Sequence, residues 1–251
     1  MTDTAPHIPA PASPPAPQQA TATAGPRKPD HPSPLRWAVT ARVSSLQEGY
    51  RKDSPRAVQD LARLRRGIGR QANETPDLWG LLGIEQFYAA QPEDRPLSEA
   101  KAVRAERAAH VAVTLWALHQ QSNRTKAMHA DDGASLGAAV RRLMAGTESD
   151  EPIRKRLLRA GTATTFDVLS HRLRELVVLL RKAEIPLDYG LLADHLEQWQ
   201  KPGGPTRVRQ AWGRDFHAYR RPTDPERPRN STPEAPDTHA TADRDDMKDQ
   251  T

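Results

Sequence analysis

The sequence of 251 residues contains no cysteine. This absence excludes disulfides, thiolate nucleophiles and cysteine-ligated zinc, and it is typical of proteins from a reducing compartment. No stretch reaches 18 consecutive apolar residues, so we expect no membrane span. The N-terminus lacks the apolar segment of a secretory signal peptide, and we therefore expect a soluble, cytoplasmic protein.

Large apolar residues are also scarce at both ends of the chain. Residues 1–34 contain ten prolines, and residues 223–251 are rich in proline, aspartate and threonine. Proline fixes φ and removes a backbone donor, and neither segment carries enough apolar surface to offset the entropy of ordering. We therefore predict a disordered proline-rich tail over 1–34, a disordered acidic tail over 223–251 and a folded core between them.

The core shows helical spacing throughout and no convincing strand alternation. Ser54-Pro55 is a typical helix start, after which apolar residues recur every three or four positions. Further helices are predicted over 35–50, from Ser98 to about Ser122, from Ser135, from Asp150, over 165–183, from Asp188 and over 206–219. The predicted fold class is all-α. The polar stretch "AGTESDEP" suggests an N-terminal helical domain over 35–147 and a C-terminal helical bundle over 148–222.

Acidic residues are outnumbered in the core, where 31 basic residues against 22 acidic ones give a net charge of +9. Such a balance favours a polyanionic partner, although 29 of the 37 basic residues are arginine and this can partly reflect genomic composition. Aromatic residues number only 12 and form no repeating stacking platform. We therefore expect contact with phosphates, without readout of sequence.

Arginine gathers in short segments of the core. In "RLRRGIGR", Arg63, Arg66 and Arg70 have the spacing of one helix face, and "IRKRLLR" has four basic residues in six. The planar guanidinium forms bidentate bonds with phosphate. Each cluster alone is more often a solvated face, but several on one basic core favour binding to a nucleic-acid backbone.

Three histidines lie close together in the sequence, but their positions do not predict a metal site. Nine residues separate His110 from His119, which places their rings on opposite sides of one helix. His129 belongs to a polar segment, 123–134, that we expect to be an exposed, mobile loop. Since no H-E-x-x-H motif is present either, we predict no metal and no cofactor, and we interpret His110 as a hydrogen-bonded core residue.

The acidic residues lack the spacing of a catalytic pair. Asp131-Asp132 beside Gly133 is typical of a turn, and Asp194 and Glu197 lie on an amphipathic helix. No glycine-rich phosphate loop or nucleophile elbow is found. We therefore expect a protein that is not an enzyme, and a metal-dependent nuclease is the less favoured alternative.

Six segments together resemble the CasB family, the small subunit of the type I-E CRISPR Cascade complex. They occur in the order of the family and cover roughly residues 50–220. These segments are "LARLRRGIGR", "DLWGLLGI", "AHVAVTLWALHQQS", "SLGAAVRRL", "LRELVVLLRKAEIPLDYGLLADHLEQWQ" and "VRQAWGRDFHAY".

The resemblance implies an all-helical, non-enzymatic protein that takes part in antiviral defence. It implies two copies packed head to tail, in contact with the other Cascade subunits. It also implies that basic surface residues help to hold the hybrid of guide RNA and target DNA and the displaced strand. In guide-directed systems base pairing reads the sequence while protein holds the backbone, which agrees with basic helices that lack a catalytic constellation.

The resemblance to the family implies that ten basic residues, carried over by their positions in the matching sequence, are the candidates for binding nucleic acid. They are Arg65, Arg66, Arg104, Arg124, Lys126, Arg141, Arg142, Arg159, Arg172 and Arg174. The alternative for each is a surface charge or an intramolecular salt bridge, such as Arg174 with Glu175 or Arg104 with Glu99. A standalone helix-turn-helix regulator is a further alternative, but no compact unit with a recognition helix is evident.

Overall fold

The computed structural model describes residues 32–92, 96–145 and 150–219. Within these ranges the chain forms nine α-helices and two short 3-10 segments, and the only β-pairing is an isolated bridge between His129 and Leu187. The predicted all-α fold is confirmed. The predicted tails lie almost wholly outside the described residues, except that Ser33 and Pro34 already belong to the start of the first helix. The elements are α1 (Pro34–Arg51), α2 (Pro55–Arg66), η1 (Ala72–Glu74), η2 (Pro76–Leu78), α3 (Ile84–Ala89), α4 (Glu99–Gln120), α5 (Leu136–Met144), α6 (Glu151–Gly161), α7 (Phe166–Lys182), α8 (Tyr189–Trp199) and α9 (Gly204–Ala218).

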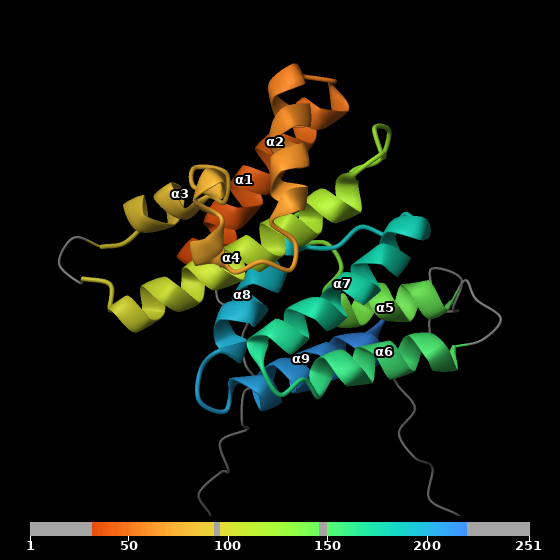
Figure 1. Ribbon diagram of the computed structural model, residues 1–251. Helices are drawn as coiled ribbons and strands as arrows, with labels where there is room; N and C mark the ends of the chain where they lie inside the picture. The colour runs from red at the N-terminus through yellow and green to blue at the C-terminus, as the bar shows by residue number, and fades with distance from the viewer. Residues whose placement is uncertain (1–31, 93–95, 146–149, 220–251) are drawn as a thin grey trace, which may run out of the picture.

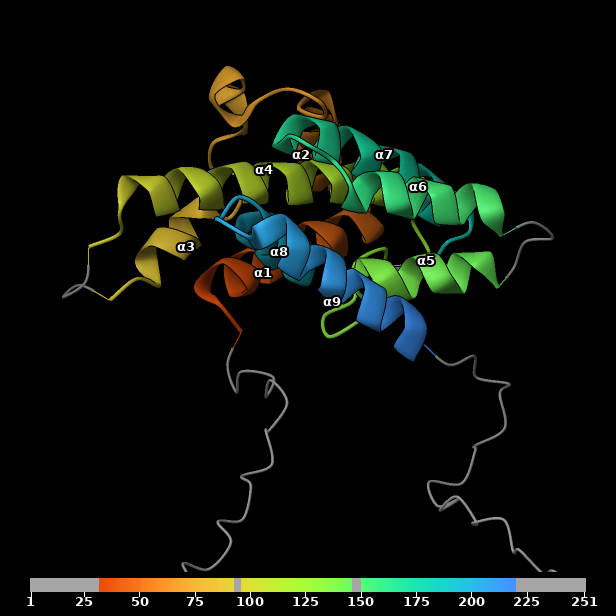
Figure 2. The same ribbon diagram turned by 90° about the horizontal axis from the view of Figure 1, so that it is seen from below.

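Helix α4 runs through the middle of the molecule (Figure 1). Helices α1, α2 and α3 lie on one side of it, and α5, α6, α7 and α9 lie on the other. Helix α8 packs against both α1 and α4, while α9 packs along α5. The view from below shows α8 and α9 following each other beneath α4, with α5 beside α9 (Figure 2).

Most helix starts follow the sequence signals. Ser135, Thr165 and Asp188 each accept a hydrogen bond from the backbone N–H three residues later, which satisfies a donor that the first turn leaves free. The short helix α3 was not predicted. It has only six residues and follows Gly83, whose φ of 79° sets the sharp entry into the helix.

The buried apolar residues form one cluster that extends across the proposed boundary near residue 147. Glycines allow the closest helix contacts: a Cβ on Gly137 in α5 would overlap the carbonyl oxygen of Trp212 in α9, and one on Gly190 in α8 would overlap the hydroxyl of Thr40 in α1. Helices from both parts of the chain thus pack together directly, and the division into two domains stays a prediction. None of the helices in the described ranges is long and apolar enough to cross a membrane.

Candidate nucleic-acid interface

Three of the predicted arginines surround one hollow at the junction of α2, α4 and α7. Arg65 and Arg66 come from the last turn of α2, and Arg174 comes from α7. The hollow has a volume of about 480 Å³, and its remaining lining is Ala62, Ile68, Leu118 and Gln121. We call this hollow the arginine groove.

The end of α2 is fixed by a glycine. Gly67 is the C-terminal cap, and a Cβ at this position would overlap the side chain of Leu78 and crowd Thr114 of α4. The absence of a side chain therefore lets the last turn of α2 lie directly on α4. Cationic side chains at the C-terminus of a helix also interact favourably with its dipole, which suits Arg65 and Arg66.

The three guanidinium groups of the arginine groove are exposed. Over residues 32–92, 96–145 and 150–219, the side chains of Arg65, Arg66 and Arg174 form no hydrogen bond or ion pair. The sequence suggested a salt bridge of Arg174 with Glu175, but Glu175 instead pairs with Arg172 at 2.9 Å. Arg174 is therefore left available to a ligand.

A second hollow, of about 320 Å³, adjoins the arginine groove through Ile68 and Arg174. Arg107, which was not among the predicted residues, lines it from α4. Its guanidinium lies 3.4 Å from the carboxylate of Asp167 and 4.6 Å from the ring centre of Phe166. No local sequence signal distinguishes Arg107, because its position depends on the packing of α4 against α7.

The predicted common helix face of Arg63, Arg66 and Arg70 is wrong for Arg70. Helix α2 ends at Arg66, so Arg70 lies beyond it and donates to the carbonyl oxygen of Glu74 at 2.7 Å. Arg63, three residues before Arg66, does not line the groove and donates to the carbonyl oxygen of Asp77. Of the three, Arg66 alone lines the arginine groove.

Four of the predicted residues form intramolecular ion pairs outside the arginine groove, and three of them pair with acids that are distant in the sequence, namely Arg104, Arg124 and Lys126. Arg104 is half-buried, and its Nε lies 3.6 Å from the carboxylate of Glu197, so that Arg104 pairs with Glu197 and not with the suggested Glu99. Arg124 pairs with Asp53 and stacks over the ring of Tyr50 at 4.1 Å from its centre.

Lys126 pairs with Glu184 in the same way. These ion pairs tie 123–126 to the turn after α1 and to the residues that follow α7, so Arg124 and Lys126 anchor the loop in this structure.

The remaining predicted residues lie on the C-terminal side of the fold. Arg141 covers the ring of Phe216, 5.6 Å from its centre. Arg142 on α5 and Arg159 on α6 are exposed, and neither lines the arginine groove. Arg172, paired with Glu175, also lies outside the groove lining.

His110 has the role predicted for it. It is buried and lies 3.1 Å from the hydroxyl of Thr75, and burial, with a smaller contribution from the charge of Arg70, lowers its pKa to about 4. The ring is therefore neutral at pH 7.

The expectation of an exposed loop over 123–134 is wrong for its central part. Met128 is fully buried and His129 is only 3% exposed. The Nδ1 of His129 accepts a hydrogen bond from the backbone N–H of Tyr189 at 3.2 Å, and the hydroxyl of Tyr189 lies 2.9 Å from Nδ1 of His119. Both histidines thus hold one buried tyrosine, and burial lowers both of their pKa values, that of His119 to about 4.

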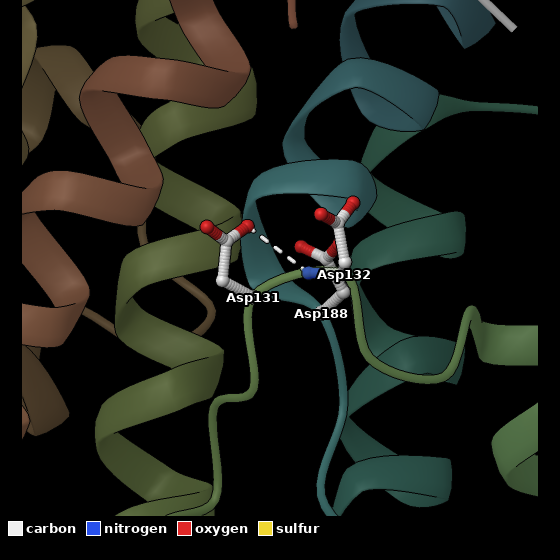
Figure 3. A group of neighbouring side chains, drawn as sticks. All are labelled: Asp131, Asp132 and Asp188. Atoms are coloured by element: carbon white, nitrogen blue, oxygen red, sulfur yellow. Dashed lines mark hydrogen bonds between the residues drawn. The ribbon is translucent and has the colours of Figure 1, made fainter.

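Three carboxylates, which the sequence did not bring together, meet where this loop reaches the start of α8. The oxygens of Asp131, Asp132 and Asp188 lie within 4.8 Å of one another (Figure 3). Arg36 donates to Asp132 at 2.9 Å and to Asp188 at 2.8 Å, and Asp188 also caps α8 through the N–H of Leu191. The cluster is therefore compensated by an arginine and used for capping, which gives it a structural role.

The sequence model of the family described as CRISPR-associated protein Cse2 matches residues 60–217, more than half of the chain. The crystal structure of CasB from Thermobifida fusca is 54% identical, with a TM-score of 0.65 over 73% of this chain and 98% of that chain.

Two more distant structures share the fold. A Cse2-family CRISPR-associated protein from Thermus thermophilus is 22% identical, with a TM-score of 0.53 over 74% of this chain and 98% of that chain. A chain of a CRISPR RNA-guided surveillance complex is 23% identical, with a TM-score of 0.52 over 73% and 93%. No curated protein matches the chain in sequence. The match to the family model and the 54% identity to CasB agree with the segments quoted above, and the chain belongs to the Cse2 family of CRISPR-associated proteins.

Proposed function

We propose that this protein is the non-catalytic small subunit of a type I-E CRISPR Cascade complex. In this role it binds the backbone of the hybrid of guide RNA and target DNA and the displaced strand, and it stabilises the R-loop. Its membership of the Cse2 family supports the proposal, as does the fold it shares with a chain of a CRISPR RNA-guided surveillance complex.

The arginine groove is the observation that carries the proposal. Arg65, Arg66 and Arg174 come from two helices that are far apart in the sequence, and they present three exposed guanidinium groups around one hollow. Folding alone does not require such an arrangement, because like charges repel one another. A phosphate backbone supplies the opposite charge and accepts bidentate hydrogen bonds from arginine.

The arrangement of the acidic residues in the described ranges agrees with a role in binding and not in catalysis. The one carboxylate cluster there is compensated by Arg36 and caps α8. Guide pairing reads the target sequence in such complexes, so the protein needs only to hold the backbone. The partners would be the other Cascade subunits, the guide RNA, the target DNA and a second copy of this chain packed head to tail, in the cytoplasm.

The proposal is tested by assembling the Cascade complex with a subunit in which Arg65, Arg66 and Arg174 are all changed to glutamate. We expect the complex to assemble with its guide RNA, while the R-loop on target DNA dissociates faster than with the wild-type subunit. The control carries glutamate at Arg124 and Lys126, which anchor the loop instead of lining the groove. Equal R-loop lifetimes for the wild type and the groove variant would contradict the proposal.

The absence of catalysis has its own test. The purified chain is incubated with DNA and RNA in magnesium, manganese or zinc, and we expect no cleavage. Metal-dependent cutting that is abolished by Asp188→Asn would contradict a purely binding role.

A further inference from the structure

Trp79 is the most exposed large hydrophobic side chain in the described ranges, with 70% of its surface open to solvent. It lies in the segment between η2 and α3, and Leu78 and Leu81 on either side of it are buried. In this segment the side chains of Leu78 and Leu81 therefore lie in the core, while the indole of Trp79 faces the solvent. An aromatic ring with most of its surface in solvent gains little free energy from burial, so its stabilising role in the fold is small.

The segment that carries Trp79 is held firmly. Arg42 of α1 donates from Nε to the carbonyl oxygen of Leu81 at 3.1 Å and from Nη2 to that of Gly80 at 3.0 Å. Arg63 of α2 donates to the carbonyl oxygen of Asp77. Two arginines thus fix the backbone on both sides of the indole, which is presented in a defined place.

Trp79 forms part of the wall of a hollow of about 660 Å³ between α1, α2 and this segment, which we call the Trp79 hollow. Arg42, Arg56 and Arg63 line it, together with Gln59. Of its described lining residues, Asp60 is the only acidic one, and it lies 3.8 Å from Arg63. The lining therefore carries excess positive charge beside an exposed π-face.

Arg56 has no hydrogen bond or ion pair with the part of the chain that the structure describes, and its side chain is exposed. At 100° per residue, Arg56 and Arg63 lie about 20° apart around α2, and Arg66 lies about 60° further round. The outer surface of α2 thus leads from the Trp79 hollow to the arginine groove, over about 15 Å of helix between Arg56 and Arg66.

We propose that the Trp79 hollow binds single-stranded nucleic acid, with one unpaired base stacked on the indole of Trp79 and a neighbouring phosphate at Arg56. This inference rests on the proposed binding of nucleic acid by the arginine groove, which the same strand reaches along α2. An aromatic ring beside cationic side chains is the usual device for binding single strands, because every base has a π-face. A protein partner is less favoured, because the polar side chains around the indole offer few apolar contacts.

The test uses the full chain and two fluorescein-labelled ligands of equal length, an oligothymidylate single strand and a DNA duplex. In Trp79→Ala we expect affinity for the single strand to fall roughly 5-fold or more, while affinity for the duplex is unchanged. Trp79→Phe keeps a ring and should recover much of the loss. Trp37→Ala is the matched control, because Trp37 on α1 is 49% exposed and does not line the hollow.

Tryptophan fluorescence gives a second readout. Binding of the single strand should quench emission in the wild type and in Trp37→Ala, and the quenching should be much smaller in Trp79→Ala. Unchanged single-strand affinity in Trp79→Ala overturns the inference, and so does an equal loss for duplex and single strand. If Trp79→Ala retains single-strand affinity but fails to join the Cascade complex, the hollow binds protein and the inference is wrong.

The binding measurements distinguish a failure of the proposed function from a failure of the Trp79 inference. If the arginine groove does not bind nucleic acid, its glutamate variant retains wild-type affinity for both ligands. If only the Trp79 inference is wrong, the groove variant loses affinity while Trp79→Ala does not.

Discussion

Replacing Arg65, Arg66 and Arg174 by alanine removes three positive charges from the arginine groove. These side chains are exposed and form no hydrogen bond or ion pair within the described ranges. The free energy of unfolding should therefore change by no more than about 0.5 kcal/mol for each substitution. Any loss of binding then reports on contacts with the ligand.

The size of the expected change in the salt dependence of nucleic-acid affinity follows from counterion release. A phosphate contact contributes about 0.7 to the slope of log K against log salt concentration for a single strand, and about 0.9 for a duplex. Three lost contacts should therefore flatten the slope by about 2 to 3. The affinity difference between wild type and variant should be largest at low salt and should shrink as salt increases.

The assay is fluorescence anisotropy with labelled DNA or RNA over a series of potassium chloride concentrations. The control removes the same number of charges from α9, where Arg207, Arg209 and Arg214 are exposed and do not line the groove. We expect the control to retain most of the wild-type slope. If both variants flatten the slope equally, binding depends on net charge alone and the groove has no special role.

Three further predictions concern the fold. Gly137→Ala should destabilise the protein by about 1–3 kcal/mol in chemical denaturation, because α5 and α9 are in contact at this glycine. Gly213→Ala is the control, since there is open space for a methyl group, and it should stabilise the protein by up to about 1 kcal/mol. Burial lowers the pKa of His110 to about 4, so between pH 6.5 and about 4 the unfolded chain binds a proton that the folded chain does not, and this one group should lower stability by up to about 1.4 kcal/mol for each unit by which pH falls. His119 and His195, whose pKa values burial also lowers to about 4, act in the same sense, whereas Asp194, whose pKa burial raises to about 6, acts in the opposite sense because it is protonated first in the folded state. His110→Gln should therefore reduce the net slope measured by denaturation at each pH by up to this one-proton share. Arg124→Ala should cost about 1 kcal/mol or less and leave nucleic-acid affinity unchanged in anisotropy, because its ion pair anchors a loop.

The helices could be predicted from the sequence because their information is local. Apolar spacing and capping residues such as Ser135, Thr165 and Asp188 lie within a few positions of the helices that they define. The six-residue helix α3 is too short to show a period, and its start depends on the left-handed conformation of Gly83. The sequence therefore predicts the long elements and misses the short one.

The candidate site could be predicted only in part. Arg65 and Arg66 stand in one short basic segment, but that Arg174 joins them follows from the packing of α2 and α7 on α4. Likewise, Arg104 and Lys126 are paired with acids 93 and 58 positions away, Glu197 and Glu184. Which charges remain free is thus decided by contacts between distant parts of the chain.

The burial of His129 was missed for the same reason. Its segment looks like an exposed loop because it is polar and contains glycine and aspartate. In the structure Gln47 of α1 accepts the backbone N–H of His129 and donates to its carbonyl oxygen, and Tyr189 donates to its ring. These partners satisfy the backbone N–H, the carbonyl oxygen and the ring Nδ1 of His129, and so permit this part of a polar segment to be buried.

Site-specific photo-crosslinking tests the role of the arginine groove most directly. A photoreactive amino acid is placed at Ala62, which lines the groove, and in a second variant at Arg209, which is exposed on α9. Each variant is assembled into the Cascade complex on target DNA and irradiated. We predict that position 62 crosslinks to guide RNA or target DNA and that position 209 does not. Crosslinks to nucleic acid from position 209 with none from position 62 would contradict the assignment of the groove.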